Sequence, residues 1–360
     1  MAPSPRFHRL TVRDVRRETA DAVSIAFAVP EALADAFAFT PGQYLTLRTR
    51  MDGAELRRSY SISSGLDDGE LRIAVKRVDG GAFSSFANDG LQAGDAVEVM
   101  PPMGRFTHTP APAVAKTYAG FASGSGITPV ISIIRSVLAR EPASRFFLFY
   151  GNRSTGSIIF REALEDLKDR CLDRLSVFHV LSRETQDISI LNGRLDGDKA
   201  RLLIAAMVPG GVDEAFVCGP AGMLDSIEAA LVAGGLPRER VHVERFTPAD
   251  GAVVTPRRPI AQAAAAAPTA IATVVVDGIS TEVPVAEGEA VIDAALRAGL
   301  DLPYSCKGGM CCTCRAKVTD GAVTMDVNYS LQPWELEAGF VLTCQAKPTT
   351  ARVTVDYDAM

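Results

Sequence analysis

The nonapeptide CKGGMCCTC, residues 306–314, places four cysteines within one short loop, and a fifth follows at Cys344 in LTCQ. Cys306, Cys311 and Cys314 have the spacing C-x4-C-x2-C, and Cys344 lies apart from them. This is the spacing with which four thiolates hold a [2Fe–2S] cluster in plant-type sites. The loop therefore predicts such a cluster with Cys306, Cys311, Cys314 and Cys344 as its ligands.

Two alternatives concern the same loop. Structural zinc also takes four thiolates, but its ligands usually come as two short pairs, whereas here three lie in one loop and the fourth is alone. A C-x5-C-x-C register with Cys312 in place of Cys311 is also conceivable; we expect Cys312 to be a small filler or a neighbouring thiol instead. Gly308 and Gly309 allow the loop to wrap closely, with backbone N–H groups directed at sulfur.

Composition describes a protein of two or three ordinary domains. The 360 residues are 47% hydrophobic and 22% charged, which is typical of soluble globular chains. A net charge of -6 argues against nucleic acid as a partner, and from residue 271 onward twelve acidic residues face six basic ones. The start, MAPSPRFHRL, has no apolar signal region, and no segment is long and apolar enough to span a bilayer. We expect a cytoplasmic protein without a membrane partner.

Three regions differ in pattern. Residues 1–110 contain short alternating runs broken by Gly, Pro and Asp, which predict an antiparallel β-barrel: AVSIAFAV, QYLTLRTR, ELRRSYSIS, ELRIAVKRV and DAVEVMPP. Residues 111–248 alternate apolar runs with helical stretches, which predicts an α/β domain with a doubly wound parallel sheet. Its pairs are TYAGFAS with PVISIIRSVLAR, RFFLFYG with REALEDLKDR, and EAFVCG with AGMLDSIEAALVAGG.

The C-terminal region follows a segment rich in Ala and Pro. Residues 249–270 lack an amphipathic period and are expected to be a linker. Residues 271–360 begin with a predicted hairpin that turns at Asp277-Gly278, followed by a helix in AVIDAALRAGL that ends at Gly299. Strands at RAKVTDG and ARVTVDY complete a small sheet crossed by one helix.

The tetrapeptide Arg58-Ser59-Tyr60-Ser61 follows the strand PGQYLTL. Here the chain resembles the ferredoxin–NADP reductase superfamily, whose flavin-binding barrel carries R-x-Y-[ST]. The resemblance implies that Arg58 contacts the flavin phosphate, Tyr60 stacks on the ring system and Ser61 acts beside its reactive nitrogen. A guanidinium, an aromatic face and a hydroxyl suit these roles. Taken alone, a strand with a hydrogen-bonded Tyr would explain the motif equally well.

The segment GGAFSSF, residues 80–86, strengthens this interpretation. Two glycines before a helix make an anion site from backbone amides and the helix dipole. In the superfamily this segment receives the flavin pyrophosphate, which implies Gly81, Phe83 and Ser84 as binding residues and favours FAD over FMN. A plain helix cap is the alternative.

A second glycine-rich turn, Gly124-Ser-Gly126-Ile-Thr128-Pro129, follows the strand TYAGFAS. It lacks the third glycine of the Rossmann fingerprint. It resembles instead the superfamily's G-x-G-[IL]-[TA]-P loop, which holds the pyrophosphate of the nicotinamide nucleotide. We expect Pro129 at the first helical position, where its missing N–H costs no hydrogen bond.

The ends of later strands supply further candidates. Cys218-Gly219-Pro220 resembles the motif that lies beside the nicotinamide, although a bare Cys at a strand end is more often a buried thiol. The segment ERF, residues 244–246, closes the α/β domain just before the linker. We predict three catalytic residues: Ser61, Cys218 and Glu244. The resemblance implies that Phe246 covers the other flavin face.

Basic residues bear on the choice of nucleotide. Arg153 in YGNRSTGS and Ser182-Arg183 in VLSRETQ follow the second and third strands of the α/β domain. A 2′-phosphate needs such groups, whereas an acidic residue usually selects NADH. The sequence favours NADPH.

The resemblance extends over the whole chain. Segments such as PGQYLTL, YGNRS, CKGGMC and GFVLTCQA resemble the reductase components of bacterial phenylacetyl-CoA 1,2-epoxidases, with a C-terminal β-grasp ferredoxin domain. This implies electron transfer from NADPH through FAD and a [2Fe–2S] cluster to a diiron oxygenase component. Alternatives are a reductase for an aromatic dioxygenase or hybrid-cluster protein, and a flavin/iron–sulfur sensor without turnover.

Overall fold

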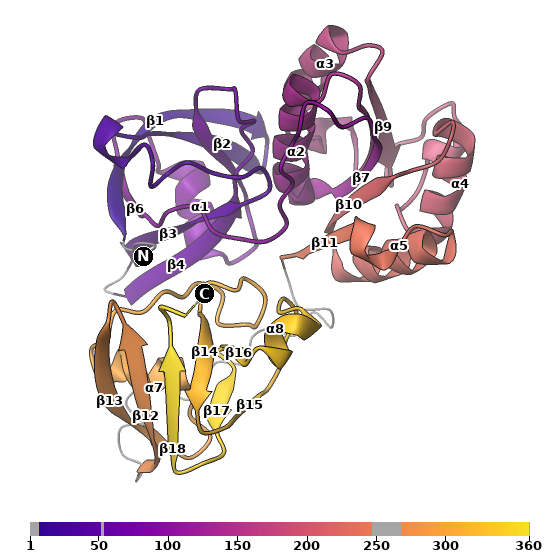
Figure 1. Cartoon of the computed structure of the whole chain (residues 1–360). Coiled ribbons are helices and arrows are strands. Elements are labelled where there is room, and N and C mark those ends of the chain that lie inside the picture. The colour runs from indigo at the N-terminus through magenta and orange to yellow at the C-terminus, as the bar shows by residue number, and fades with distance from the viewer. Residues whose placement is uncertain (1–6, 52–53, 247–267, 360) are drawn as a thin grey trace. The chain divides into compact units, whose positions relative to one another are not determined.

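A computed structural model describes residues 7–51, 54–246 and 268–359. These residues form two compact units (Figure 1): the larger has residues 8–56 and 60–246 as far as they are described, and the smaller has residues 268–359 together with Phe7 and residues 57–59. Most of the predicted linker, residues 249–267, lies outside the described ranges. Its last three residues are not linker, because the first strand of the smaller unit begins at Pro268. No helix within the described ranges is long and apolar enough to cross a membrane.

The first domain of the larger unit is an antiparallel barrel of six strands in the order β4-β3-β6-β1-β2-β5. A bridge between Ile62 and Ile73 joins the two outer strands. The strands are β1 His8–Thr19, β2 Ala22–Ala28, β3 Tyr44–Met51, β4 Ala54–Ser61, β5 Leu71–Lys76 and β6 Ala96–Val99; with them lie η1 Glu31–Leu33 and helix α1 Ala82–Asp89. The predicted barrel is confirmed. Strand β1 was not predicted, because its many charged residues obscure the alternation of buried Leu10 and Val12 with exposed neighbours.

The second domain is a parallel sheet in the order β11-β10-β7-β8-β9, with helices on both faces. Its elements are β7 Thr117–Ser123, η2 Gly124–Gly126, α2 Ile127–Arg140, β8 Arg145–Asn152, η3 Thr155–Ser157, α3 Arg161–Arg170, β9 Leu175–Leu181, η4 Ser189–Leu191, α4 Gly197–Met207, β10 Glu214–Gly219, α5 Ala221–Ala233, η5 Arg238–Arg240 and β11 Val241–Arg245. The chain starts at β7, adds strands on one side and then on the other. The switch point between β7 and β10 is where such sheets bind ligands.

The smaller unit has a mixed sheet in the order β13-β12-β18-β14-β16, with β12 and β18 parallel, and a β15–β17 ribbon. Its elements are β12 Pro268–Val276, β13 Ile279–Ala286, α7 Val291–Arg297, β14 Arg315–Asp320, β15 Val323–Met325, α8 Pro333–Glu337, β16 Phe340–Leu342, β17 Ala346–Pro348 and β18 Arg352–Asp356. The hairpin turn is at Asp277-Gly278 as predicted, with positive φ of 53° and 74°. The helix cap is Ala298, and Gly299 follows it with φ 88°.

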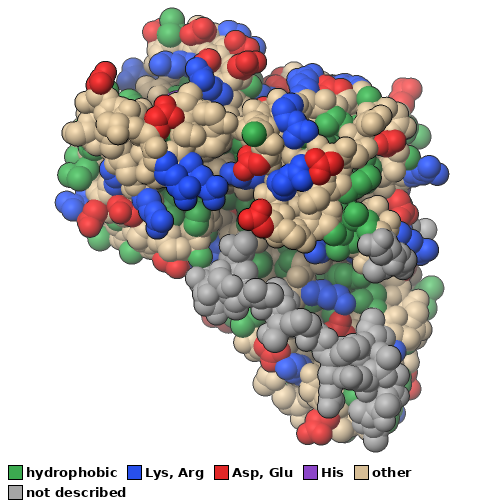
Figure 2. Space-filling view, turned by 180° about the vertical axis from the view of Figure 1, so that it is seen from behind, with side chains coloured by type: hydrophobic (Ala, Val, Ile, Leu, Met, Phe, Trp, Pro, Cys, Tyr) green, Lys and Arg blue, Asp and Glu red, His purple; other side chains and the backbone are tan. Residues whose placement is uncertain are grey.

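Surface charge differs between the regions of the chain. On the face of the larger unit seen in Figure 2, basic and acidic side chains lie interspersed. This agrees with the sequence, in which the net charge of -6 comes entirely from residues 271–360.

Candidate functional site

The four predicted cluster ligands lie in the smaller unit as two pairs. The pKa of the Cys306 thiol is lowered to about 5 by a hydrogen bond with Cys311, and hydrogen bonding with Cys314 lowers the pKa of Cys344. The backbone N–H of Gly308 donates to Cys306 Sγ at 3.3 Å, which confirms the expectation of an amide directed at sulfur. The pKa of each partner thiol, Cys311 and Cys314, is raised, so one sulfur of each pair favours the thiolate, the form that binds iron.

The way in which the thiols pair distinguishes a [2Fe–2S] cluster from a single zinc ion. A [2Fe–2S] cluster needs two thiolates at each of two irons, and the pairs Cys306–Cys311 and Cys314–Cys344 match that demand. A single zinc ion would need all four around one point. The residues therefore fit the cluster better than zinc.

Cys312 lies differently from the other cysteines of the loop. Its backbone is left-handed, with φ 53°, and the residue packs half-buried against the hydrophobic core of the smaller unit. The two thiol pairs are formed by the other four cysteines. The C-x4-C-x2-C register, with Cys311 and not Cys312 as the second ligand, stays a prediction.

Two polar residues beside the cluster loop were missed in the sequence. Thr313 donates its hydroxyl proton to Cys311 Sγ at 3.1 Å, and Gln345 Nε2 donates to Cys344 Sγ at 3.3 Å and to the carbonyl of Lys307 at 2.9 Å. Donors to thiolate sulfur tune the potential of a cluster. Their position next to a predicted ligand cysteine was the available signal.

The two predicted flavin motifs meet in the barrel. Tyr60 lies on β4, and its ring packs on Phe83 of α1 with centroids 5.4 Å apart and a 30° tilt. Phe83 is 2% exposed, so its side chain supports Tyr60 from within the core. Ser61 is buried at the end of β4, and Arg58 is exposed on the same strand.

The turn before α1 has its own hydrogen bonds. Gly81 is the N-cap, and Ser84 Oγ accepts from the Val78 N–H at 3.0 Å and donates to the Gly81 carbonyl at 3.1 Å. The Ser84 hydroxyl therefore closes the turn. The groups of this segment that could bind an anion are the backbone N–H groups in the first turn of α1.

The two nucleotide motifs lie against each other at the switch point of the sheet. A Cβ at Gly126 would stand 2.1 Å from the carbonyl oxygen of Cys218, and one at Gly219 would stand 2.6 Å from Met223 Cε. At Gly126 the neighbour is backbone, so only glycine permits the approach, whereas at Gly219 the neighbour is the flexible end of the Met223 side chain. The Thr128 hydroxyl donates to the Ser125 carbonyl at 2.9 Å, and Pro220 is the N-cap of α5.

One expectation about this turn is wrong. Pro129 is the third residue of α2, which begins at Ile127 after the one-turn helix η2. Proline is still tolerated there, because N–H groups of the first turn have no acceptor within the helix.

The basic residues predicted for the 2′-phosphate gather at the ends of β8 and β9. The Arg183 N–H donates to the Arg153 carbonyl at 2.8 Å, and the Ser182 hydroxyl donates to the Asn152 carbonyl at 3.2 Å. The nearby Glu184 carboxylate accepts from Thr155 N and Oγ1 at 2.8 and 2.6 Å. Arg153, Ser182 and Arg183 are exposed.

The predicted catalytic residues Cys218 and Glu244 are neighbours on the paired strands β10 and β11. Burial raises the pKa of Glu244 to about 8 and raises that of the fully buried Cys218 thiol as well. Both groups are therefore largely protonated at neutral pH. Phe246 follows β11 and is 38% exposed.

Lys76 is a further candidate that was missed. It ends β5, and a Cβ at Gly124 would lie 3.8 Å from its Nζ. A cation beside the glycine-rich turn suits a phosphate. A lysine at a strand end is too common a signal to be recognised in the sequence.

Comparisons with known proteins agree with this division. Three family models match: an oxidoreductase FAD-binding domain over residues 9–108, an oxidoreductase NAD-binding domain over 121–229 and a 2Fe-2S iron-sulfur cluster binding domain over 274–349.

Curated relatives match almost end to end. The chain is 47% identical to a component of the 1,2-phenylacetyl-CoA epoxidase of Escherichia coli, over 92% of each chain. It is 37% identical to the ferredoxin reductase component of 3-ketosteroid-9-alpha-monooxygenase of Rhodococcus rhodochrous, over 91% of this chain and 90% of the relative. Phthalate dioxygenase reductase shares the fold, with a TM-score of 0.57 and 23% identity over 97% of this chain and 98% of that one.

Proposed function

Because the chain belongs to the family of oxygenase reductases that join an FAD-binding, an NAD-binding and a [2Fe–2S] domain, we propose that it carries electrons from NADPH to the oxygenase component of a phenylacetyl-CoA epoxidase. The observation that carries the proposal is the 47% identity to the Escherichia coli epoxidase component over 92% of both chains. The protein is an NAD(P)H-dependent flavin and iron–sulfur oxidoreductase. The diiron partner, the preference for NADPH and a cytoplasmic location are parts of the proposal.

Each domain has its own task. When bound, the flavin takes two electrons from the nicotinamide and releases them singly, and the cluster carries one at a time. Residues 1–110 would bind FAD through Arg58, Tyr60, Ser61 and the turn at Gly81. Residues 111–248 would bind the nucleotide at Gly124–Pro129 and Cys218–Pro220. The unit that begins with β12 at Pro268 would hold the cluster, and residues 249–267 would be the linker.

The experiment that tests this function is reconstitution with the purified oxygenase component. Phenylacetyl-CoA epoxidation should depend on the reductase and on NADPH. Replacement of the partner by a 3-ketosteroid monooxygenase oxygenase component or an aromatic dioxygenase should give little coupled turnover. Equal turnover with a different partner would contradict the epoxidase assignment. If mixing with NADPH does not bleach the flavin absorption, the result favours a sensor without turnover.

Arg183→Ala tests the choice of nucleotide. We expect KM for NADPH to rise about tenfold or more, because the variant lacks a guanidinium for the 2′-phosphate. KM for NADH should stay within about twofold, and Arg201→Ala on the surface of α4 is the matched control. Steady-state kinetics with a one-electron acceptor measures both constants. An equal rise in both would show that Arg183 does not read the 2′-phosphate.

Glu244 predicts a pH dependence. Its pKa of about 8 means that it is protonated below that pH and ionised above it. If the nucleotide covers Glu244, binding favours the neutral form, so above pH 8 binding takes up a proton and KM for NADPH rises, by about tenfold per pH unit at most. Glu244→Gln cannot ionise and should keep a flat KM between about pH 7 and 9. The same rise in that variant would assign the titration to another group.

A further inference from the structure

The loop between β4 and β5 runs along one face of helix α2. The Ser132 hydroxyl donates to the Ser64 carbonyl at 2.6 Å, and the Leu66 N–H donates to Ser136 Oγ at 3.1 Å. Two ion pairs continue the contact, Arg135 with Asp68 at 2.6 Å and Arg140 with Asp67 at 2.8 Å. We call this contact the seam: residues 64–68 against Ser132, Arg135, Ser136 and Arg140.

Helix α2 is mostly apolar, but its residues in the seam are polar or charged. These residues recur at three- and four-residue intervals, so they share one face of α2. Ser64, Ser132 and Ser136 are 0% exposed. The Ser136 hydroxyl donates in turn to the Ser132 carbonyl at 2.8 Å. Buried hydroxyls cost stability unless they are paired, and here the pairs join two domains.

Gly65 brings the loop and the helix into close contact. A Cβ at this position would stand 2.7 Å from Arg135 Cβ. The backbone of Gly65 is not left-handed, so the close approach alone requires glycine. Its N–H donates to Asp68 Oδ2 at 2.8 Å, the same oxygen that Arg135 binds.

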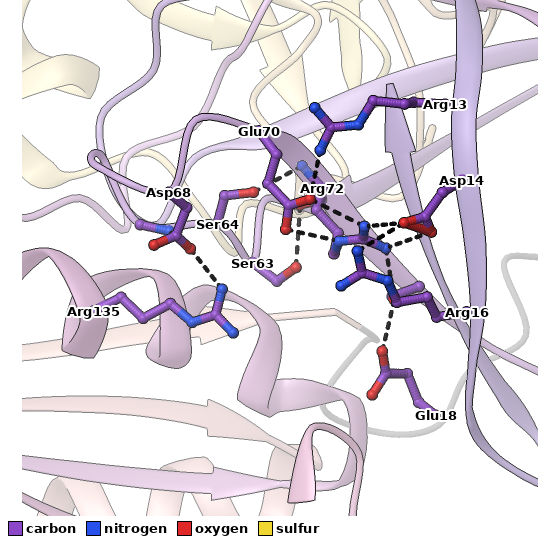
Figure 3. Close-up of polar contacts among 12 residues, drawn as sticks. Arg13, Asp14, Arg16, Glu18, Ser63, Ser64, Asp68, Glu70, Arg72 and Arg135 are labelled. Atoms are coloured by element: carbon purple, nitrogen blue, oxygen red, sulfur yellow. Dashed lines mark hydrogen bonds and ion pairs between the residues drawn. The ribbon is translucent and has the colours of Figure 1, made fainter. Parts of the chain in front are cut away.

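The other side of the seam is anchored in the barrel (Figure 3). Arg72 of β5 is buried, and its N–H donates to Ser64 Oγ at 2.8 Å while its carbonyl accepts from Ser63 Oγ at 3.1 Å. Asp14 and Glu70 bind its guanidinium at 2.7 and 2.9 Å. These hydrogen bonds connect Ser63 and Ser64 to β5 of the barrel.

The seam starts close to both cofactor motifs. Ser64 lies three positions after Ser61 of the flavin strand, and Ser132 lies one helical turn after Thr128 of the nucleotide turn. We propose that the seam positions the flavin-binding strand against the nicotinamide-binding turn for hydride transfer, with Gly65, Ser132 and Arg135 as positioning residues. This inference rests on the reductase chemistry and is independent of the oxygenase partner.

Gly65→Ala tests the proposal in the full-length holoenzyme. The added methyl group pushes loop and helix apart, and a displacement of about 1 Å costs up to about 100-fold in rate. We expect the limiting rate of flavin reduction, measured by stopped flow at saturating NADPH, to fall at least tenfold. The Kd for NADP⁺ should change less than about threefold, with FAD and iron content unchanged. Hydrogen exchange of residues 64–68 should accelerate.

Rescue distinguishes positioning from general damage. Arg135→Gly removes the Cβ that the new methyl group would meet, so Gly65→Ala/Arg135→Gly should reduce flavin within about threefold of Arg135→Gly alone. Arg201→Ala, which removes an exposed ion pair with Asp198 on α4, is the matched control and should behave as wild type. Should Gly65→Ala not fold, Ser132→Ala removes one seam hydrogen bond without added bulk and should slow reduction about three- to tenfold.

Two results would overturn the proposal. One is an unchanged limiting rate in a folded, FAD-loaded Gly65→Ala protein, or in Ser132→Ala when that variant stands in for it. The other is loss of rate, nucleotide affinity and FAD together without rescue by Arg135→Gly, which would reduce the seam to a structural contact.

Discussion

Cys344→Ser is expected to abolish the [2Fe–2S] absorption bands and to slow electron delivery to a one-electron protein acceptor by at least about 100-fold. Cys344 is buried, pairs with Cys314 and is the one predicted ligand outside the loop. A serine hydroxyl is a poor substitute for thiolate at iron, so the pair can no longer hold its half of the cluster. Stopped-flow reduction of FAD by NADPH should remain within about twofold, because that step belongs to the larger unit.

Cys312→Ser is the matched control, since it removes a thiol from the same loop. It should retain iron, acid-labile sulfide and the visible spectrum, because the predicted ligands are the other four cysteines of the smaller unit and Cys312 packs against its hydrophobic core. Loss of the cluster in Cys312→Ser with retention in Cys311→Ser would favour the alternative register. A colourless wild-type protein that binds one zinc per chain would refute the cluster altogether.

Gly126→Ala is expected to produce the second large effect, a loss of flavin reduction by NADPH of at least about 100-fold. The new Cβ would stand 2.1 Å from the Cys218 carbonyl oxygen, so the two nucleotide motifs must separate. The close atom belongs to the backbone of β10, so it cannot move aside as a flexible side chain could. Hydride transfer is sensitive to displacements of about 1 Å. FAD and cluster content should persist, because neither predicted site contains Gly126.

Gly156→Ala is the control for Gly126→Ala. This glycine lies in η3, has no atom within 4 Å of an added Cβ and does not have a positive φ. Its alanine variant should bind NADP⁺ and reduce FAD as wild type does. Normal kinetics in a folded Gly126→Ala protein would show that the two motifs do not act together.

Local signals in the sequence were sufficient for the domain types and most motifs. Cysteine spacing, the turn Asp277-Gly278 and the apolar runs of β7, β8 and β10 each depend on neighbours within a few residues, so pattern alone recovers them. Strand β1 and the first residue of α2 could not be predicted from the sequence in this way. The alternation in β1 is hidden by charge, and the one-turn helix η2 shifts Pro129 to the third helical position.

The sequence by itself determined that this protein belongs to a family of electron-transfer reductases, and it predicts which cysteines bind iron and which turns bind phosphate. Only the tertiary structure decided which of these groups meet. The contact of Gly126 with Cys218, the pairing of Cys314 with Cys344 and the seam of Gly65 against Arg135 join residues far apart in the chain. Such contacts depend on strand order and side-chain packing, which have no local period that a sequence pattern could reveal.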